Sequence, residues 1–406
     1  MVAVRRVRFR QHRKAQSREP RSLDGLRCLG PACFVEKGGA DQPAPLLSSP
    51  TMRILHVIAE MALGGAERVV LQLLADARAY GDTTGLACAP GGRLLLEAVA
   101  LGARQYEVPL QRRSAVATMR GAGKLRRAIE DFRPDVIHTH NVRATVATRV
   151  ALIGLGSKAA LLTSVQGLDP GDYRAASRLL RFTTSHVIAC SPSVARSLAS
   201  AGFPPAWIDV IHNAAHLAPA DDSRMAALRE RFLIGERPLV VGLGRLMPQK
   251  SWSTLIEAAS HLEGVDIVVA GEGELRAPLE RAAHLQGDRV RFIGPVSDVA
   301  ALLGLASCVV STSTWEGLPL ALLEALSLGV PAVATAVDGV RDVVSPDAAM
   351  LVEPGDPGAV ADAISRVLAE PGLARRLSEA GMTLSRSWTP QAMVLRYRAA
   401  YQAAVG

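Results

Sequence analysis

The chain has 406 residues, of which 49% are hydrophobic and 21% are charged, as in globular proteins that bury large cores. This balance excludes a wholly disordered chain, and the length predicts two or three domains. Aromatic residues make up only 4%, so stacking surfaces for single-stranded nucleic acid are not expected. The five cysteines form no CxxC pair, which argues against a zinc ribbon or a disulfide scaffold and favours a reducing, cytoplasmic compartment.

The net charge of +8 is concentrated in residues 1–51, which contain ten Lys and Arg and four Asp and Glu. Only +2 is left for residues 52–406, so the basic pI does not indicate a nucleic-acid partner. Residues 1–51 lack the apolar core of a secretory signal and show no periodic pattern. We expect a disordered basic extension or, alternatively, translation that starts at Met52.

From residue 52 onward, short apolar runs alternate with helical periodicity, which predicts βα units and parallel sheets. A first series of strands is predicted at 53–58, 83–88, 135–138, 161–165, 186–190 and 210–212. A second series is predicted at 239–243, 266–270, 290–293, 308–311 and 332–335. The polar segment 219–237 between them is interpreted as an irregular linker, and 390–405 is predicted to form a terminal helix.

Two such series predict an α/β protein with two doubly wound, Rossmann-like domains at 52–218 and 238–388. Ligands bind at the carboxyl ends of the strands in these folds, so the cleft between the domains is the expected site. The most apolar stretch, residues 317–337, is long enough to span a bilayer. Glu324, Gly329 and Pro331 interrupt it, so a buried helix, a turn and a buried strand explain it better.

Two motifs lie in the first predicted domain. Gly64 and Gly65 follow the first strand, where they allow close approach of a ligand to the next helix or simply form a turn. His138 and His140 end a buried strand and share one face. No nearby Asp, Glu or Cys completes a metal-ligand set, so no metal is expected. A histidine in a buried strand is most often part of the core. The position of His140 at the end of the strand nevertheless favours a role for it in the ligand site.

The loop after the strand 239–243 contains two cations, Arg245 and Lys250, just before a predicted helix. A guanidinium and an ammonium near a helix N-terminus suit a pyrophosphate. The alternative is that both side chains are simply solvated.

The most informative motif is the segment that begins at Glu316 and ends at Glu324. If the segment is helical throughout, their carboxylates lie about 12 Å apart, too far to act on one bond. They could instead bind opposite parts of one extended ligand. Glu324 stands among apolar residues, where an ionised side chain is costly unless it is paired. Its alternative role is a cap or a salt bridge between the domains.

Taken together, these blocks resemble the retaining nucleotide-sugar glycosyltransferases of family four, which have the GT-B fold. The resemblance covers roughly residues 52–405. It implies that Arg245 and Lys250 hold the donor diphosphate and stabilise the departing nucleotide. It also implies that Glu324 binds the ribose hydroxyls and that Glu316 contacts the donor sugar.

The same resemblance implies further donor contacts and a domain arrangement. The implied contacts come from Gly64, Gly65, Gly244, the backbone N–H groups of Gly317 and Leu318, and His140, with His138 as the second choice for the histidine. No cofactor or metal is implied, and residues 389–406 are expected to cross over and pack on the first domain. Three positions depart from the family pattern, namely Ser251, Asn213-Ala214-Ala215 and Asp342, which stands where a Glu is common.

The implied reaction is transfer of a hexose-type sugar, with retention, to a cell-envelope, polysaccharide or lipid-linked acceptor. The rivals are a sugar-nucleotide epimerase, a phosphorylase of similar architecture and a non-catalytic sugar-nucleotide binding module. Basic residues cluster on the acceptor side at Arg112, Arg113, Arg120, Lys124, Arg126 and Arg127. They indicate either a solvated helix face or contact with an anionic membrane, so we expect a cytoplasmic protein that works there or at the inner face of the membrane.

Overall fold

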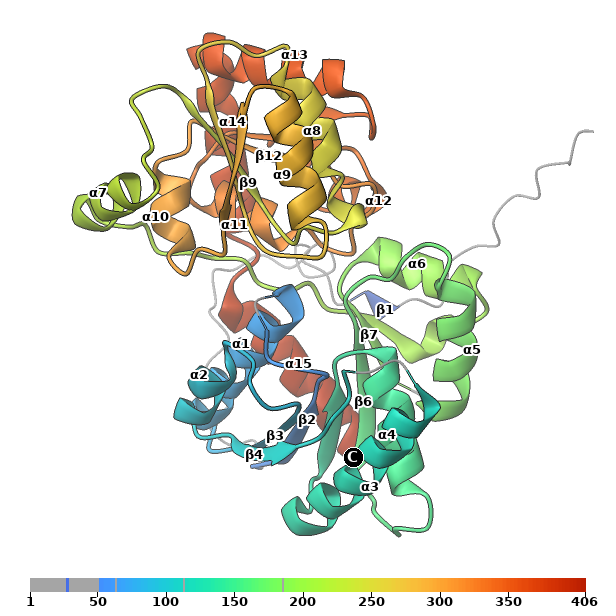
Figure 1. Ribbon diagram of the computed structural model, residues 1–406. Coiled ribbons are helices and arrows are strands. Elements are labelled where there is room, and N and C mark those ends of the chain that lie inside the picture. The colour runs from blue at the N-terminus through green and yellow to red at the C-terminus, as the bar shows by residue number, and fades with distance from the viewer. Residues whose placement is uncertain (1–26, 29–50, 63, 112–113, 185) are drawn as a thin grey trace, which may run out of the picture.

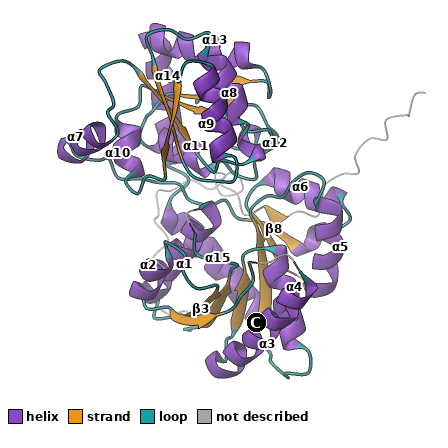
Figure 2. Ribbon diagram, in the orientation of Figure 1, coloured by secondary structure: helices purple, strands orange, loops and turns teal. Residues whose placement is uncertain are grey.

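The computed structural model describes residues 27–28, 51–62, 64–111, 114–184 and 186–406. Two lobes stand one above the other, and each is a parallel sheet with helices on both faces (Figures 1 and 2). This arrangement confirms the predicted pair of doubly wound domains. The predicted disordered extension lies outside the described residues, apart from Thr51 and the two-residue strand β1 (Arg27–Cys28), which pairs with β8.

The sheet of the first lobe has the strand order β1-β8-β7-β6-β5-β2-β3-β4. Its strands after β1 are β2 (Arg53–Val57), β3 (Thr83–Cys88), β4 (Arg104–Glu107), β5 (Val136–Thr139), β6 (Ala160–Val165), β7 (His186–Ala189) and β8 (Ile208–Val210). The helices between them are α1 (Gly65–Ala79), α2 (Leu95–Ala100), α3 (Ala115–Phe132), α4 (Val142–Leu152), α5 (Tyr173–Thr183) and α6 (Pro192–Ser200). The order reverses at β2 and β5, and ligands bind at such a switch point in this class of fold.

The sheet of the second lobe has the order β11-β10-β9-β12-β13-β14. Its strands are β9 (Leu239–Leu243), β10 (Asp266–Ala270), β11 (Val290–Gly294), β12 (Cys308–Ser311), β13 (Ala332–Thr335) and β14 (Met350–Val352). The helices of this lobe are α7 (Asp222–Arg231), α8 (Trp252–Ala259), α9 (Arg276–Leu285), α10 (Val299–Gly304), α11 (Leu320–Ser327), α12 (Asp338–Arg341), α13 (Pro357–Ala369) and α14 (Pro371–Ser385). The switch point here lies between β9 and β12.

The structure differs from the sequence expectations at sheet edges and in the linker. The edge strands β4 and β14 were not predicted, and β8 begins two residues before the predicted run. Segment 219–237 is not irregular throughout, because it contains α7, which is capped by Asp221 through the N–H of Arg224. Leu228 of α7 is buried in the core of the second lobe, so tertiary packing stabilises a helix whose sequence is mostly polar.

The two lobes share one apolar cluster. Cys190 and Val194 of the first lobe belong to the same buried cluster as Leu318 and Val340 of the second lobe. The last helix, α15 (Pro390–Val405), returns to the first lobe and packs against β5, β6 and α1 (Figure 1). This is the crossover helix of the predicted fold class. Within the described residues, no helix combines the length and the apolar character needed to cross a bilayer.

Candidate active site

Lys250 and Glu316 form the centre of the site in the second lobe. Lys250 ends the short 3-10 helix Pro248–Lys250 after β9, and its Nζ lies 2.5 Å from Oε1 of Glu316. The two side chains are 17% and 6% exposed, respectively. Gly244 lies beside them, and a Cβ at this position would lie 3.0 Å from Cε of Lys250, a close contact. The predicted diphosphate-binding ammonium is therefore held close to the predicted sugar-binding carboxylate.

Two further donors fix the Glu316 carboxylate. Ser313 Oγ donates to Oε1 at 2.6 Å, and Gln249 Nε2 donates to Oε2 at 3.3 Å. Glu316 lies on the loop between β12 and α11, and α11 begins only at Leu320, so the spacing for a continuous helix does not apply. A pocket at the carboxyl ends of β9 and β12 is lined by Lys250 and Glu316 together with Leu243, Ser311, Pro319 and Leu322.

Arg245 extends from the same loop into more exposed space. Its backbone carbonyl accepts a hydrogen bond of 3.0 Å from Nε1 of Trp252, which fixes the loop, while its guanidinium lies 3.4 Å from Oε1 of Gln249. Arg245 also acts across the gap between the lobes. Burial raises the pKa of Glu67 on α1, and the positive charge of Arg245 partly offsets that rise.

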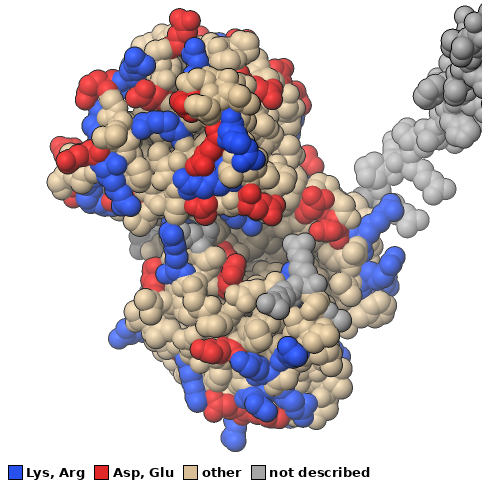
Figure 3. Space-filling model, in the orientation of Figure 1, with Lys and Arg blue, Asp and Glu red and all other residues tan. Residues whose placement is uncertain are grey.

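Glycines allow the two lobes to meet closely at the site. A Cβ on Gly317 would lie 2.2 Å from the carbonyl oxygen of Gln166, and a Cβ on Gly65 would lie 2.8 Å from Leu320. Gly64 is the N-cap of α1, and Leu318 is buried in the cluster shared by both lobes. Figure 3 shows a hollow between the lobes with side chains of both charges around it. The predicted residues Gly64, Gly65, Gly317 and Leu318 thus lie where the lobes meet.

Glu324 occupies the second turn of α11 and faces the first lobe. Its carboxylate Oε1 lies 3.6 Å from Nη1 of Arg68 on α1, and the two side chains are 13% and 38% exposed. Burial raises the pKa of Glu324, and Arg68 partly offsets that rise. The structure therefore shows the salt bridge between lobes that the sequence left open as an alternative for Glu324.

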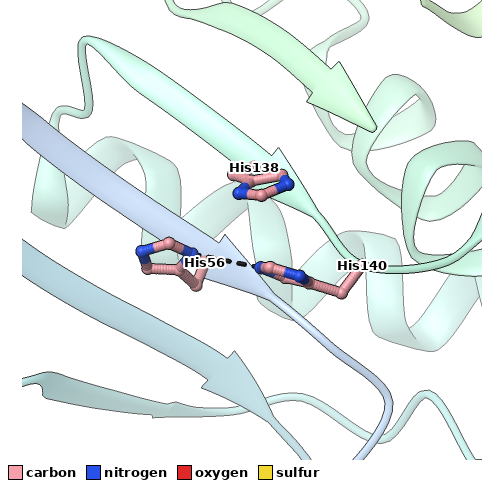
Figure 4. A group of neighbouring side chains, drawn as sticks. All are labelled: His56, His138 and His140. Carbon is pink, nitrogen blue, oxygen red and sulfur yellow. Dashed lines mark hydrogen bonds between the residues drawn. The ribbon is translucent and has the colours of Figure 1, made fainter. Parts of the chain in front are cut away.

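His140 lies at the end of β5 in a buried group of histidines (Figure 4). Its Nε2 lies 3.1 Å from Nδ1 of His56, the histidine of β2. Burial lowers the pKa of His140 well below its usual range, and the neighbouring His56 lowers it further. His140 is only 3% exposed, so it lies beneath the surface of the cleft, and its role toward a sugar stays a prediction.

His138 is also fully buried, and both of its ring nitrogens are engaged. Nδ1 lies 2.7 Å from the Tyr401 hydroxyl of α15, and Nε2 lies 2.7 Å from Oγ of Ser164. The imidazoles of His56, His138 and His140 have nitrogens within 4.8 Å of one another, a spacing that a metal ion could bridge. Nε2 of His56 and Nδ1 of His140 have no hydrogen-bond partner among the described residues, whereas either nitrogen of His138 would give up a hydrogen bond to bind an ion. No carboxylate or thiolate of the described residues belongs to the group.

The positions that depart from the family pattern have structural roles. Ser251 adopts the left-handed conformation with φ of 45°, a conformation that favours glycine. Asp342 accepts hydrogen bonds from the backbone N–H of Ser193 and from Arg196, both on α6 of the other lobe. Asn213 is buried, and its Nδ2 donates to Oε1 of Gln166 at 2.5 Å.

Sequence reasoning missed several partners of the site residues. His56, Arg68, Ser313 and Gln249 contact His140, Glu324 and Glu316. Arg68 comes three residues after Gly65, and this closeness to the two glycines was the one available signal. The others become visible only when the strands and loops are placed side by side.

Two family models match the chain. Residues 63–219 match the model "Glycosyltransferase Family 4", and residues 225–383 match "Glycosyl transferases group 1". The two matches adjoin at the linker, and together they span most of residues 52–406.

Among individual proteins, the chain is similar to the alpha-D-kanosaminyltransferase of Streptomyces kanamyceticus, with 34% identity over 42% of this chain and 48% of that protein. This match therefore spans about half of that relative. The lipopolysaccharide core biosynthesis glycosyltransferase LpsD of Rhizobium meliloti is 27% identical over 83% of this chain and 94% of its own. The crystal structure of Anabaena HepE in complex with UDP and glucose has a TM-score of 0.78 and 19% identity, and the match covers 86% of this chain and 99% of that one. The chain therefore belongs to glycosyl transferase group 1, family 4, a family of retaining glycosyltransferases with the GT-B fold.

Proposed function

We propose that this protein transfers a hexose-type sugar from a nucleotide-diphosphosugar to a cell-envelope, polysaccharide or lipid-linked glycan, with retention of the anomeric configuration. The observation that carries the proposal is the pairing of Lys250 with Glu316 at the carboxyl ends of β9 and β12, with Arg245 linked to Glu316 through Gln249. LpsD is named for lipopolysaccharide core biosynthesis, which supports a cell-envelope acceptor.

The proposed roles follow from the charges and their positions. Arg245 and Lys250 bind the diphosphate and stabilise the charge that develops on it as the glycosidic bond breaks. Glu316 and the N–H groups of Gly317 and Leu318 hold the sugar hydroxyls, while Glu324 binds the ribose. Gly64 and Gly65 allow the sugar or the phosphate to approach the N–H groups at the N-terminus of α1. Gly244 leaves room for the Lys250 side chain.

The donor is identified by a panel of UDP-, GDP- and ADP-sugars tested for a saturable increase in melting temperature. UDP-sugars come first because HepE was crystallised with UDP and glucose. Product analysis with donor alone and with donor plus acceptor then separates a transferase from an epimerase or a binding module. If no sugar nucleotide stabilises the protein, the proposal is wrong.

Lys250→Ala tests the diphosphate assignment. We expect transfer to fall to below about 1% of wild type, because a preorganised cation near a developing charge contributes a factor of 10² or more. The control is Arg281→Ala, which removes an exposed cation of α9 in the same lobe. Circular dichroism checks that both variants fold, and near-normal turnover of folded Lys250→Ala would overturn the assignment.

Contact with an anionic membrane is the second part of the proposal. Arg120, Lys124, Arg126 and Arg127 lie on α3, and two apolar side chains of that helix, Val116 and Met119, are 62% and 61% exposed. A helix that exposes cations and apolar side chains suits an anionic bilayer surface. Arg112 and Arg113 of the predicted cluster lie outside the described residues.

Sedimentation with vesicles that contain anionic lipid tests this contact. Reversal of the charge at Lys124, Arg126 and Arg127 should abolish binding at physiological salt, because each cation near such a surface contributes about 1 kcal/mol. Reversal of Arg375 and Arg376, which are exposed on α14 of the other lobe, is the control. Equal binding of both variants would show that α3 does not contact lipid.

A further inference from the structure

Glu324 is a carboxylate in an apolar helix that takes its counter-charge from the other lobe. Its neighbours Leu322, Leu323 and Ala325 on α11 are buried. Arg68 on α1 supplies the positive charge, with Nη1 3.6 Å from Oε1 of Glu324. Arg68 thus offsets the burial of a carboxylate that belongs to the opposite lobe.

The packing of α1 against α11 brings the two side chains together. Gly65 begins α1, Leu320 begins α11, and a Cβ on Gly65 would lie 2.8 Å from Cδ1 of Leu320. Arg68 comes three residues after Gly65, and Glu324 comes four residues after Leu320. Residues three or four apart lie on one face of a helix, so each charged side chain stands one turn beyond the contact. Figure 1 shows α1 at the top of the lower lobe, beneath the end of the upper lobe that contains α11.

The length of the ion pair leaves the Glu324 carboxylate without a hydrogen bond from Arg68. A distance of 3.6 Å is too long for a hydrogen bond, so the attraction is mainly Coulombic. Across the described part of the chain, no hydrogen bond to the Glu324 carboxylate is present. Both oxygens therefore keep lone pairs for other donors, and an ionised carboxylate only accepts hydrogen bonds.

We propose that Arg68 is a positioning residue for the donor nucleotide: it keeps the Glu324 carboxylate ionised and directed into the cleft, ready to accept hydrogen bonds from the vicinal ribose hydroxyls. This inference rests on the proposed function. Both lobes would then contribute to the part of the site that binds the nucleoside, because the carboxylate comes from α11 and its counter-charge comes from α1. The segment that follows Gly64 and Gly65 is thereby coupled to the segment between Glu316 and Glu324 through one ion pair.

The test is Arg68→Gln, measured by calorimetry with UDP, GDP or ADP, whichever the panel selects, and by steady-state kinetics. We expect the Kd of the nucleotide and the donor KM to rise about tenfold, while kcat changes less than twofold, because the lost interaction acts in binding. Arg68→Lys keeps the charge and should restore most of the affinity. Arg78→Gln removes an exposed arginine at the other end of α1 and should leave both constants unchanged.

The 2′,3′-dideoxy analogue of the same nucleotide shows whether Arg68 acts through Glu324. The analogue has no hydroxyls for the carboxylate, so wild type and Arg68→Gln should bind it with equal affinity. A tenfold difference that persists with the analogue would overturn the inference, because Arg68 would then act on another part of the nucleotide. Unchanged affinity of Arg68→Gln for the natural nucleotide would overturn it as well.

Failure of this inference can be told apart from failure of the proposed function. If wild type binds none of the nucleotides, the proposed function is wrong and the inference falls with it. If wild type binds and Glu324→Gln weakens binding while Arg68→Gln does not, only the positioning role is wrong. The Arg68→Gln/Glu324→Gln double variant should bind no more weakly than Glu324→Gln alone, since the arginine then has no carboxylate to position.

Discussion

The buried histidines beside the cleft are neutral at physiological pH. Burial lowers the pKa of His56 to about 3, far below its usual value of 6.5. Burial also lowers the pKa of His140, the hydrogen-bonded partner of His56, well below its usual range. In the unfolded chain these residues take up protons near pH 6.5, whereas in the folded protein they stay neutral to much lower pH. Their contribution to stability is therefore present above pH 6.5 and is lost as the pH falls toward 3.

His56→Asn should flatten the pH dependence of stability. Between pH 6.5 and 4 each such histidine costs about 1.4 kcal/mol of unfolding free energy per pH unit, because only the unfolded state binds the proton. The variant should lose about 1 kcal/mol at pH 7 from the missing hydrogen bond but show a shallower slope below pH 6.5. Urea denaturation at several pH values measures the slope. An unchanged slope would mean that His56 is already protonated in the native state.

Candidates for the charged residues of the site could be named from the sequence, but their partners could not. Glu324 stands in an apolar run where an ionisable residue is unusual, and Arg245, Lys250 and Glu316 follow predicted strands, where ligands bind in this class of fold, so each has a local signal. His56 lies 84 residues from His140 and meets it only because β2 and β5 pair in register. A pairing of that kind depends on the sheet order, which local periodicity does not contain.

At the scale of elements, α12 and α6 join the lobes through Asp342. Its Oδ1 lies 2.6 Å from Nη2 of Arg196, and its other oxygen accepts a hydrogen bond from the N–H of Ser193 in the first turn of α6. The N-terminus of a helix favours a negative charge. Asp342 was considered from sequence as a stand-in for a glutamate of the donor site, whereas this geometry indicates a structural contact between the lobes.

Asp342→Asn and Arg196→Gln together distinguish the two roles. A structural contact predicts that both variants lower the unfolding free energy, with Asp342→Asn losing about 1–3 kcal/mol as a charged hydrogen-bond acceptor and Arg196→Gln losing less because its side chain is 43% exposed. Thermal denaturation and donor kinetics measure both effects. A large fall in kcat in Asp342→Asn alone would instead support a direct contact with the donor sugar.

Sequence periodicity predicted the central strands better than the edges. The central strands β2, β9 and β12 are nearly continuous apolar runs, because both faces of a parallel sheet are covered by helices. The missed strand β4 is mostly exposed, and β14 has only three residues, so neither has the composition of a buried strand. Helix α7 was missed because its sequence is polar; buried Leu228 and partly buried Met225 hold it on the second lobe.

At the scale of the whole molecule, the two-lobed architecture was predictable because each lobe repeats the same alternation of strand and helix. The way the lobes meet was not. Gly317 lies against the backbone of Gln166, a contact between loops that are 151 residues apart in the sequence. Contacts between loops leave no periodic pattern in the sequence, so this contact between the lobes could be found only in the structure.

A buried ion pair joins α15 to the first lobe. Arg398 of α15 pairs with Asp82, and their side chains are 4% and 0% exposed. The other carboxylate oxygen of Asp82 accepts a hydrogen bond of 2.9 Å from the N–H of Met52, and the Arg398 guanidinium lies 4.1 Å from the centre of the Tyr80 ring. The pair thus ties the last helix of the chain to the start of β2, which leads to the Gly-Gly loop of the site.

Arg398→Met should destabilise the protein by about 3–5 kcal/mol, because it leaves the Asp82 carboxylate buried without its counter-charge. The Asp82→Asn/Arg398→Met double variant should recover part of that loss, since no buried charge then remains unpaired. Arg376→Met on exposed α14 is the control and should change stability by less than about 0.5 kcal/mol. Denaturant titration followed by circular dichroism measures all three. Equal stability of Arg398→Met and the control would mean that apolar packing of Met393, Tyr397 and Tyr401 alone holds α15 on the first lobe.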